Sequence, residues 1–148
     1  MAELKTVLAR DGLRPALGFL NSLTGHRFTS LYLFDAGTLR SHAFFDRETP
    51  DPEPPDDIPV EVSYCVYVRD SRRAFQTEDS LRDDRVIGHP KRRDILAYCG
   101  VPLTAADGRV FGTLCRFDFV PTPISEANVQ LMEAFAPLLK ETVRGARI

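Results

Sequence analysis

A run of fourteen residues in the first half of the chain, 46–59, limits the fold more than any other segment. It contains five of the eleven prolines and six acidic residues. Proline lacks an amide hydrogen and fixes its own φ angle, so neither a helix nor a central strand can form there. The run could link two domains or form a loop within one. Only 45 residues precede it, too few for a comfortable separate domain. We therefore interpret it as a mobile, extended acidic loop inside one domain that spans residues 1–148.

Two hairpins are predicted on either side of this loop. In the first, two stretches rich in aromatic and β-branched residues flank the turn Asp35-Ala36-Gly37. In the second, an apolar stretch is followed by Asp107-Gly108, a strong hairpin signal, and by a returning strand. The strands are expected at residues 28–34, 38–45, 95–103 and 110–120, with a short further strand at 75–77.

Apolar residues with helical spacing occur at both ends of the chain. Residues 2–10 and 13–23 form one broken amphipathic helix or two short ones, and a further helix begins after the capping residue Ser125. Two hairpins alone cannot bury their faces. One antiparallel sheet of five or six strands, with the terminal helices on one face, satisfies both the sheet and the helices. The predicted fold class is therefore α/β (α+β).

Charge and composition narrow the function. Lys and Arg number 19 and Asp and Glu number 21, so the net charge is −2, and nucleic acid is not expected as a main partner. The longest nearly apolar run, 95–103, is too short for a membrane span, and the first ten residues lack the apolar stretch of a secretory signal. The three cysteines have no paired spacing, which argues against a disulfide scaffold or a zinc finger. We expect a soluble cytoplasmic protein with no membrane contact.

A series of short motifs gives the second half of the chain a more specific character. In order they are Ser63-Tyr64-Cys65, DSLRDDR at 79–85, YCGVPL at 98–103, Asp107-Gly108, GTLC at 112–115, Asp118 and the closing helix from Ser125. Together they resemble a common bacterial subgroup of the GAF family of small sensory domains, over about residues 13–142. The chain departs from the subgroup at three positions. Asp84 stands where Pro is usual, Cys99 where Ala is usual and Thr122 where Arg is usual.

The resemblance implies a GAF/PAS-like fold with a pocket. The middle segments, residues 50–93, should cover the second face of the sheet and enclose that pocket. Residues 60–69 should be helical, although the apolar side chains of this stretch alternate as in a strand; we follow the resemblance. The alternating residues are Val60, Val62, Tyr64, Val66 and Val68. The candidate ligand-binding residues are Tyr64, Cys65, Phe75, Asp79 and Tyr98.

The function implied by the resemblance is a small regulatory sensor without catalytic activity. Its ligand is a small molecule of unknown identity, and no cofactor is assigned. Since the chain shows no output domain, we expect it to signal by contact with a protein partner or by dimerisation. The terminal helices are the expected homodimer surface, because Phe19 and Val129 lie off or at the edge of the apolar stripes that cover the sheet.

Two other functions stay open. A thiol redox enzyme on a GAF fold would use Cys65, Cys99 or Cys115, whereas a ligand-free dimerisation module would use none of them. Cys99 and Cys115 lie on the two arms of the second hairpin. One register lets their thiols approach, and a slip of one residue puts them on opposite faces of the sheet. Free cysteines are most often small core residues, and we expect that role and no thiol chemistry for all three.

The remaining polar residues carry weaker signals. His26, His42 and His89 have no metal-ligand spacing, so we expect no metal site and interpret them as ordinary surface or loop residues. Arginines are interleaved with acidic residues over 79–93, which favours surface ion pairs over acid–base catalysis. Asp79 is expected to cap the turn that follows it.

Overall fold

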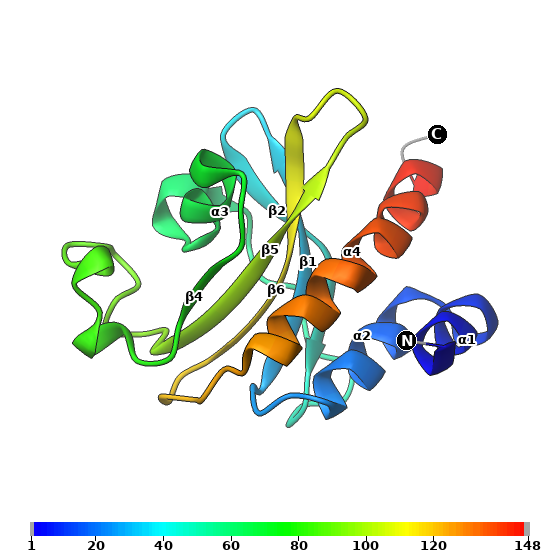
Figure 1. Cartoon of the computed structure of the whole chain (residues 1–148), viewed down its shortest axis with the longest axis horizontal. Coiled ribbons are helices and arrows are strands. Elements are labelled where there is room, and N and C mark those ends of the chain that lie inside the picture. Colours follow the sequence, from blue (N-terminus) through cyan, green and yellow to red (C-terminus); the bar gives the residue numbers. More distant parts are fainter. Residues whose placement is uncertain (1, 147–148) are drawn as a thin grey trace.

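The computed structural model describes residues 2–146 and has three layers, with a sheet between long helices on one side and shorter segments on the other (Figure 1). The helices are α1 (Ala2–Asp11), α2 (Leu13–Ser22), α3 (Cys65–Ser71) and α4 (Glu126–Ala146). The strands are β1 (Phe28–Asp35), β2 (Thr38–Asp46), β3 (Ile58–Pro59), β4 (Phe75–Thr77), β5 (Ala97–Thr104) and β6 (Val110–Asp118). The predicted α+β fold is confirmed. Within the described part of the chain, no helix is long and apolar enough to cross a membrane.

The six strands form one antiparallel sheet with the order β3-β2-β1-β6-β5-β4. Both predicted hairpins are confirmed, as β1–β2 and β5–β6. The hairpins meet in the middle of the sheet, where β1 pairs with β6 and Phe28 lies opposite Phe117. Because side chains alternate along a strand, each long strand sends every second side chain toward the helices and the others toward the middle segments.

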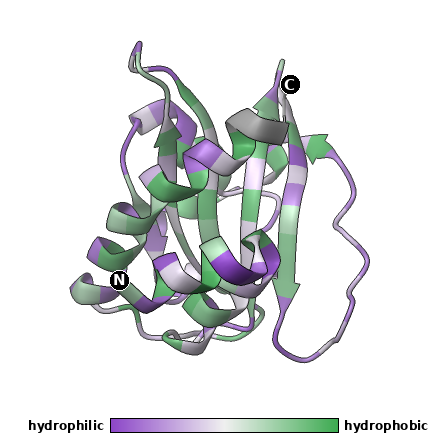
Figure 2. Cartoon of the chain, turned by 90° about the vertical axis from the view of Figure 1, so that its right-hand side faces the viewer, coloured by the Kyte–Doolittle hydropathy of each residue, from purple (hydrophilic) through white to green (hydrophobic). Residues whose placement is uncertain are grey.

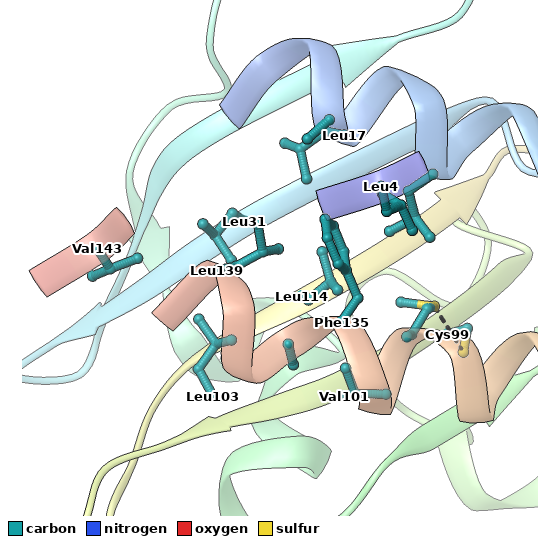
Figure 3. Close-up of a cluster of buried hydrophobic side chains, with 14 of the residues drawn as sticks. Leu4, Leu17, Leu31, Cys99, Val101, Leu103, Leu114, Phe135, Leu139 and Val143 are labelled. Carbon is teal, nitrogen blue, oxygen red and sulfur yellow. Dashed lines mark hydrogen bonds between the residues drawn. The ribbon is translucent and has the colours of Figure 1, made fainter. Parts of the chain in front are cut away.

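The main core lies between the sheet and the terminal helices (Figure 3). Leu17 from α2, Phe135 from α4 and Leu114 from β6 are all fully buried there. The sheet side of α4 is apolar with helical spacing, at Met132, Phe135, Ala136, Leu139 and Val143. Burying one large apolar side chain is worth about 1.5–3 kcal/mol. This packing holds the terminal helices on one face, as predicted, and the Ser125 side chain accepts the Asn128 amide at the start of α4 (3.1 Å).

The stretch after Pro59 is helical, as the resemblance implied, and the strand-like alternation was misleading. A 3₁₀ turn at Val60–Val62 leads into α3. A pattern with a period of two also contains a period of four, and residues four apart share one face of a helix. Val60, Tyr64 and Val68 are the buried members of the series. The same five residues therefore fit either structure, and the pattern alone could not decide between them.

Most of the acidic segment, residues 47–57, lies outside the sheet as a long, mainly hydrophilic loop (Figure 2). At its first residue, Asp46, the carboxylate accepts a hydrogen bond from Arg27 (Oδ1–Nε 2.8 Å). At its end, Ile58–Pro59 pairs with Thr38 and Leu39 as a two-residue edge strand. Residues 47–57 between these anchors form neither helix nor strand. The predicted loop is confirmed, and its mobility stays a prediction.

The residues chosen for a dimer surface are largely used inside the chain. Val129 is only 9% exposed, and Phe19 is half-buried against the same core. Both side chains therefore have partners within the protein itself. The homodimer stays a prediction, but the exposed apolar surface expected at Phe19 and Val129 no longer supports it.

Candidate functional site

A cavity of about 300 Å³ lies between the second face of the sheet and the segments that cover it. Its walls come from both hairpins, from the acidic loop and from the start of α3. The lining residues are Phe28, Tyr32, Leu39, Phe44, Pro55, Asp56, Ile58, Ser63, Tyr64, Cys65, Lys91, Ile95, Tyr98, Cys115, Phe117 and Phe119. Most of them are apolar or aromatic, and a few polar groups converge among them. This combination is typical of a small-molecule site.

The floor of the cavity is polar. Cys65, the first residue of α3, is fully buried there. Its Sγ accepts a hydrogen bond from the Tyr98 hydroxyl (3.2 Å) and lies 3.2 Å from Oγ1 of Thr113 on β6. Burial raises the pKa of the Tyr98 hydroxyl well above its ordinary value, so this group keeps its proton and stays a donor. The floor thus offers hydroxyl and thiol groups to a ligand.

Phenylalanine rings form one wall of the cavity. The Phe28 ring stacks on Phe117 with centroids 4.9 Å apart and on Phe44 at 5.7 Å, and it meets Phe119 edge-on at 5.1 Å. The Arg27 guanidinium lies over the outer side of this group, 4.7 Å from the Phe28 centroid. None of the four rings was predicted to belong to the site. Phe28 and Phe44 belong to the predicted hairpin of β1 and β2. Phe117 and Phe119 reach them only through the pairing of β1 with β6, which no local motif indicates.

Two charged residues from distant parts of the sequence line the cavity. They are Asp56 in the acidic loop and Lys91 ahead of β5. Asp56 is exposed and Lys91 is half-buried. Neither side chain forms an ion pair or hydrogen bond with any other residue in the described part of the chain. Both groups are therefore available to a charged or polar end of a ligand.

Three of the five predicted site residues meet at this cavity, and two do not. Tyr64, Cys65 and Tyr98 line it, and the Tyr64 hydroxyl is tied to the Ile95 carbonyl (3.0 Å). Phe75 lies behind Tyr64 in a cluster of rings that packs α3 against β4. Asp79 is also absent from the cavity lining and lies in a separate groove beside β4. That these residues bind a ligand stays a prediction.

The position of Asp79 agrees with a structural role. Its side chain accepts a hydrogen bond from the Leu81 amide (3.1 Å) at the start of a 3₁₀ turn, so the predicted cap is confirmed. The next acidic residue along, Asp83, pairs with Arg85 (Oδ2–Nη2 2.6 Å). Asp79 likewise pairs with Arg82 (Oδ2–Nε 3.7 Å), so the predicted ion pairs form at these two places in the connector.

The register of β5 and β6 separates two of the three cysteines. Cys99 lies opposite Arg116, and Gly100 lies opposite Cys115, so Cys99 and Cys115 point to opposite faces of the sheet. Cys99 packs on the helix side, where its thiol is 3.8 Å from Sδ of Met132 (Figure 3). All three cysteines are buried, as predicted. The structure instead places Cys115 and Cys65 in the lining of the same cavity, a combination that the sequence did not indicate.

His26 lies in the loop between α2 and β1, as one of the two interpretations had it, but it is fully buried and not a surface residue. Its Nδ1 lies 3.1 Å from Nη1 of Arg116, whose side chain is itself buried on the helix face. Burial, and then the positive charge of Arg116, lower the pKa of His26 to about 4. This polar pair lies on the opposite side of the sheet from the cavity. Among residues 2–146, no three His, Cys, Asp or Glu side chains are placed to hold a metal ion.

A search of curated proteins found similarity to one named as a cyclic di-GMP phosphodiesterase of Pseudomonas aeruginosa. The two sequences are 32% identical over 96 residues. The match covers 60% of this chain but 16% of the relative. The chain therefore spans about a sixth of the curated relative that it matches.

Solved structures share the fold over nearly the whole chain. The GAF domain of an Acinetobacter phosphoenolpyruvate-protein phosphotransferase superposes with a TM-score of 0.78 at 15% identity, covering 99% of this chain and 91% of that one. A free methionine-R-sulfoxide reductase from Neisseria meningitidis, solved with its substrate, superposes with a TM-score of 0.75 at 18% identity, covering 99% and 87%. At these identities the likeness establishes the fold.

These similarities correct the prediction that the chain has no catalytic activity. One structure with the same fold is an enzyme, the methionine sulfoxide reductase, and the curated relative is named as a phosphodiesterase. The prediction that the protein is not an enzyme is therefore wrong as drawn. Neither the fold nor the similarity to known proteins sets this chain apart from enzymes.

The family itself is established by the sequence. The model of the GAF domain family matches residues 10–142, which includes both hairpins, the cavity and most of α4. The match agrees with the order of motifs from Ser63 to Ser125. The chain therefore belongs to the GAF domain family, a family of sensory and regulatory domains.

Proposed function

We propose that residues 1–148 act as one sensory domain that binds a small, flat and largely apolar molecule in the cavity beside α3. The observation that carries this proposal is the composition of the cavity walls. An aromatic wall around Phe28 and Phe117 faces a floor of hydroxyl and thiol groups at Cys65 and Tyr98. Flat rings stack favourably on such a wall, whereas a strongly polar molecule would lose its hydration there.

The charged residues of the lining define the polar end of the ligand. Lys91 would meet an anionic group and Asp56 a cationic one, since neither is neutralised by a neighbour among the described residues. Lys91 is the more buried of the two, so its charge is less screened by water. A flat molecule with a carboxylate is therefore the preferred class.

Ligand binding would be transmitted through α3. This helix contributes Cys65 to the cavity and packs against β5 and β6. A molecule that enters between the helix and the sheet changes the contacts of both. The domain would pass this change to a protein partner or to a second copy of the chain, which is the regulatory role that we propose.

The proposal is tested with 2-naphthoate, a two-ring carboxylate, as the probe. Titration into the labelled full chain should shift the NMR signals of Tyr64, Tyr98 and Phe117 in a saturable way. Naphthalene, which lacks the carboxylate, should bind more weakly because Lys91 has no partner in it. Signals that shift only on other faces of the domain, or no saturable shifts, would contradict the proposal.

A matched pair of substitutions distinguishes binding in the cavity from nonspecific binding of the probe elsewhere on the protein. Ile58→Trp fills the cavity from β3, and Ile87→Trp places the same ring on an exposed position outside it. We expect the first variant to lose 2-naphthoate binding and the second to keep the wild-type affinity. Equal affinity in both variants would place the probe elsewhere.

A further inference from the structure

Two thiols meet at the floor of the cavity. Cys65 from α3 and Cys115 from β6 are both fully buried and both line it. Cys115 lies two residues beyond Thr113 on the same face of β6, and the Thr113 hydroxyl is 3.2 Å from Sγ of Cys65. Each of the two thiols shifts the pKa of the other. Cys99 cannot join them, because its side chain is on the other face of the sheet.

The two thiols are not equivalent. Burial keeps the pKa of Cys115 well above its ordinary value. Burial acts in the same direction on Cys65, but hydrogen bonds with Cys115, Ser63, Thr113 and Tyr98 outweigh it and lower the pKa of Cys65. Because the thiolate is the reactive form of cysteine, we assign the role of nucleophile to Cys65 and that of second thiol to Cys115.

We propose that Cys65 and Cys115 are a redox-active pair that forms a reversible disulfide when a peroxide enters the cavity. Three observations support this. The thiols come from two different elements, Thr113 on the same face of β6 as Cys115 contacts Sγ of Cys65, and the shared cavity gives a small oxidant access to otherwise buried sulfur atoms. The proposal needs the cavity as a route but needs no ligand. Peroxide oxidation and 2-naphthoate binding can therefore each succeed or fail alone.

The chemistry balances with hydrogen peroxide as the oxidant. The Cys65 sulfur attacks one oxygen, the O–O bond breaks, and the products are a sulfenic acid on Cys65 and one water molecule. The Cys115 sulfur then attacks the Cys65 sulfur, the S–O bond breaks, and the second oxygen leaves as water with the Cys115 proton. The two sulfur atoms lose two electrons and the peroxide gains them. The new bond ties α3 to β6, and a dithiol reductant reverses it.

Peptide mapping of the full chain tests the proposal. The protein is treated with hydrogen peroxide, denatured, alkylated with iodoacetamide and digested with trypsin. Cleavage after Lys and Arg puts Cys65, Cys99 and Cys115 on separate peptides, residues 48–69, 94–109 and 110–116. We expect peptides 48–69 and 110–116 to be linked with the loss of two hydrogen atoms, and peptide 94–109 to be alkylated. Dithiothreitol added before alkylation should restore three alkylated peptides.

Two variants check the order of the steps. In Cys115→Ala the reaction should stop at the sulfenic acid, so dimedone should label peptide 48–69. Cys99→Ala should form the same linked peptide as the wild type. If the Cys115 variant does not fold, the wild-type map and the Cys99 variant still decide. Three alkylated peptides after peroxide treatment, or a link that includes Cys99, would overturn the proposal.

Discussion

The two faces of the central sheet are built from the same strands but have opposite characters. On the helix face, Cys99 and Leu114 pack without exposed surface against α4. On the other face, their neighbours Tyr98 and Cys115 border a cavity of about 300 Å³. The difference lies in what covers each face. A 21-residue amphipathic helix fills the first, whereas a 7-residue helix and turns rich in charge leave the second partly empty.

The polar groups of the two faces differ as well. The helix face buries a guanidinium, Arg116, whose hydrogen-bond partners are His26 and Sδ of Met132. The cavity face buries hydroxyl and thiol groups around Cys65 and Tyr98. A buried charge is costly unless its neighbours stay neutral or opposite in sign. The helix face should therefore be sensitive to pH, and the cavity face to molecules that enter it.

The largest expected loss of stability comes from truncating a side chain on the helix face of the sheet. Phe135→Ala should lower the free energy of unfolding by about 3–5 kcal/mol, because the fully buried ring leaves a hole that α4 cannot close. Phe117→Ala on the cavity face should cost less than half as much, because that ring already borders empty space. Urea unfolding of both variants measures the difference. Equal losses would mean that the cavity face is packed as tightly as the helix face.

The next largest effect is a loss of stability at low pH that depends on His26. Its pKa is about 4 in the folded protein and about 6.5 in the unfolded chain. Between these values the unfolded chain binds a proton that the folded protein excludes, so stability falls as the pH drops from 6.5 to 4. The loss should reach about 3 kcal/mol and then level off for this group. Urea unfolding over this range, compared with His26→Gln, isolates it. An identical pH dependence in the variant would rule out His26 as its source.

Gly100→Ala is expected to lower the stability of the protein by a smaller amount. A Cβ atom on Gly100 would clash with the hydroxyl and the ring of Tyr98, which folds back over this glycine. The Tyr98 ring would move and lose its hydrogen bond to Cys65, at a cost of about 1–3 kcal/mol. Binding of 2-naphthoate should weaken as well, because Tyr98 lines the cavity. Unchanged binding with lowered stability would place Tyr98 in a purely structural role.

Sequence alone could predict the elements of this fold because each depends on residues that are close in the chain. Asp107-Gly108 sits at the tip of the second hairpin, as its dipeptide predicted. The start of the last helix also depends on a local contact, because the Ser125 hydroxyl accepts a hydrogen bond from the Asn128 amide three residues later. Where a local pattern had two solutions, as over residues 60–68, the resemblance to a family was needed to choose.

The site was harder to predict because it depends on contacts between distant segments. The resemblance identified Tyr64, Cys65 and Tyr98. It gave no register between β1 and β6, so the wall around Phe28 was missed. The pairing of Cys65 with Cys115 was missed for the same reason, since it depends on how α3 rests on β6.

The central place of β1 and β6 has a consequence for how the chain is made. The hairpin of β1 and β2 leaves the ribosome first, and the inner edge of β1 has no partner until β6 follows, since Phe28 pairs with Phe117. Pairings between distant segments form late in folding. Until then, the open edge of β1 can pair with strands of other chains. The nascent chain is thus more prone to aggregate than the finished protein, and synthesis of β6 removes that risk.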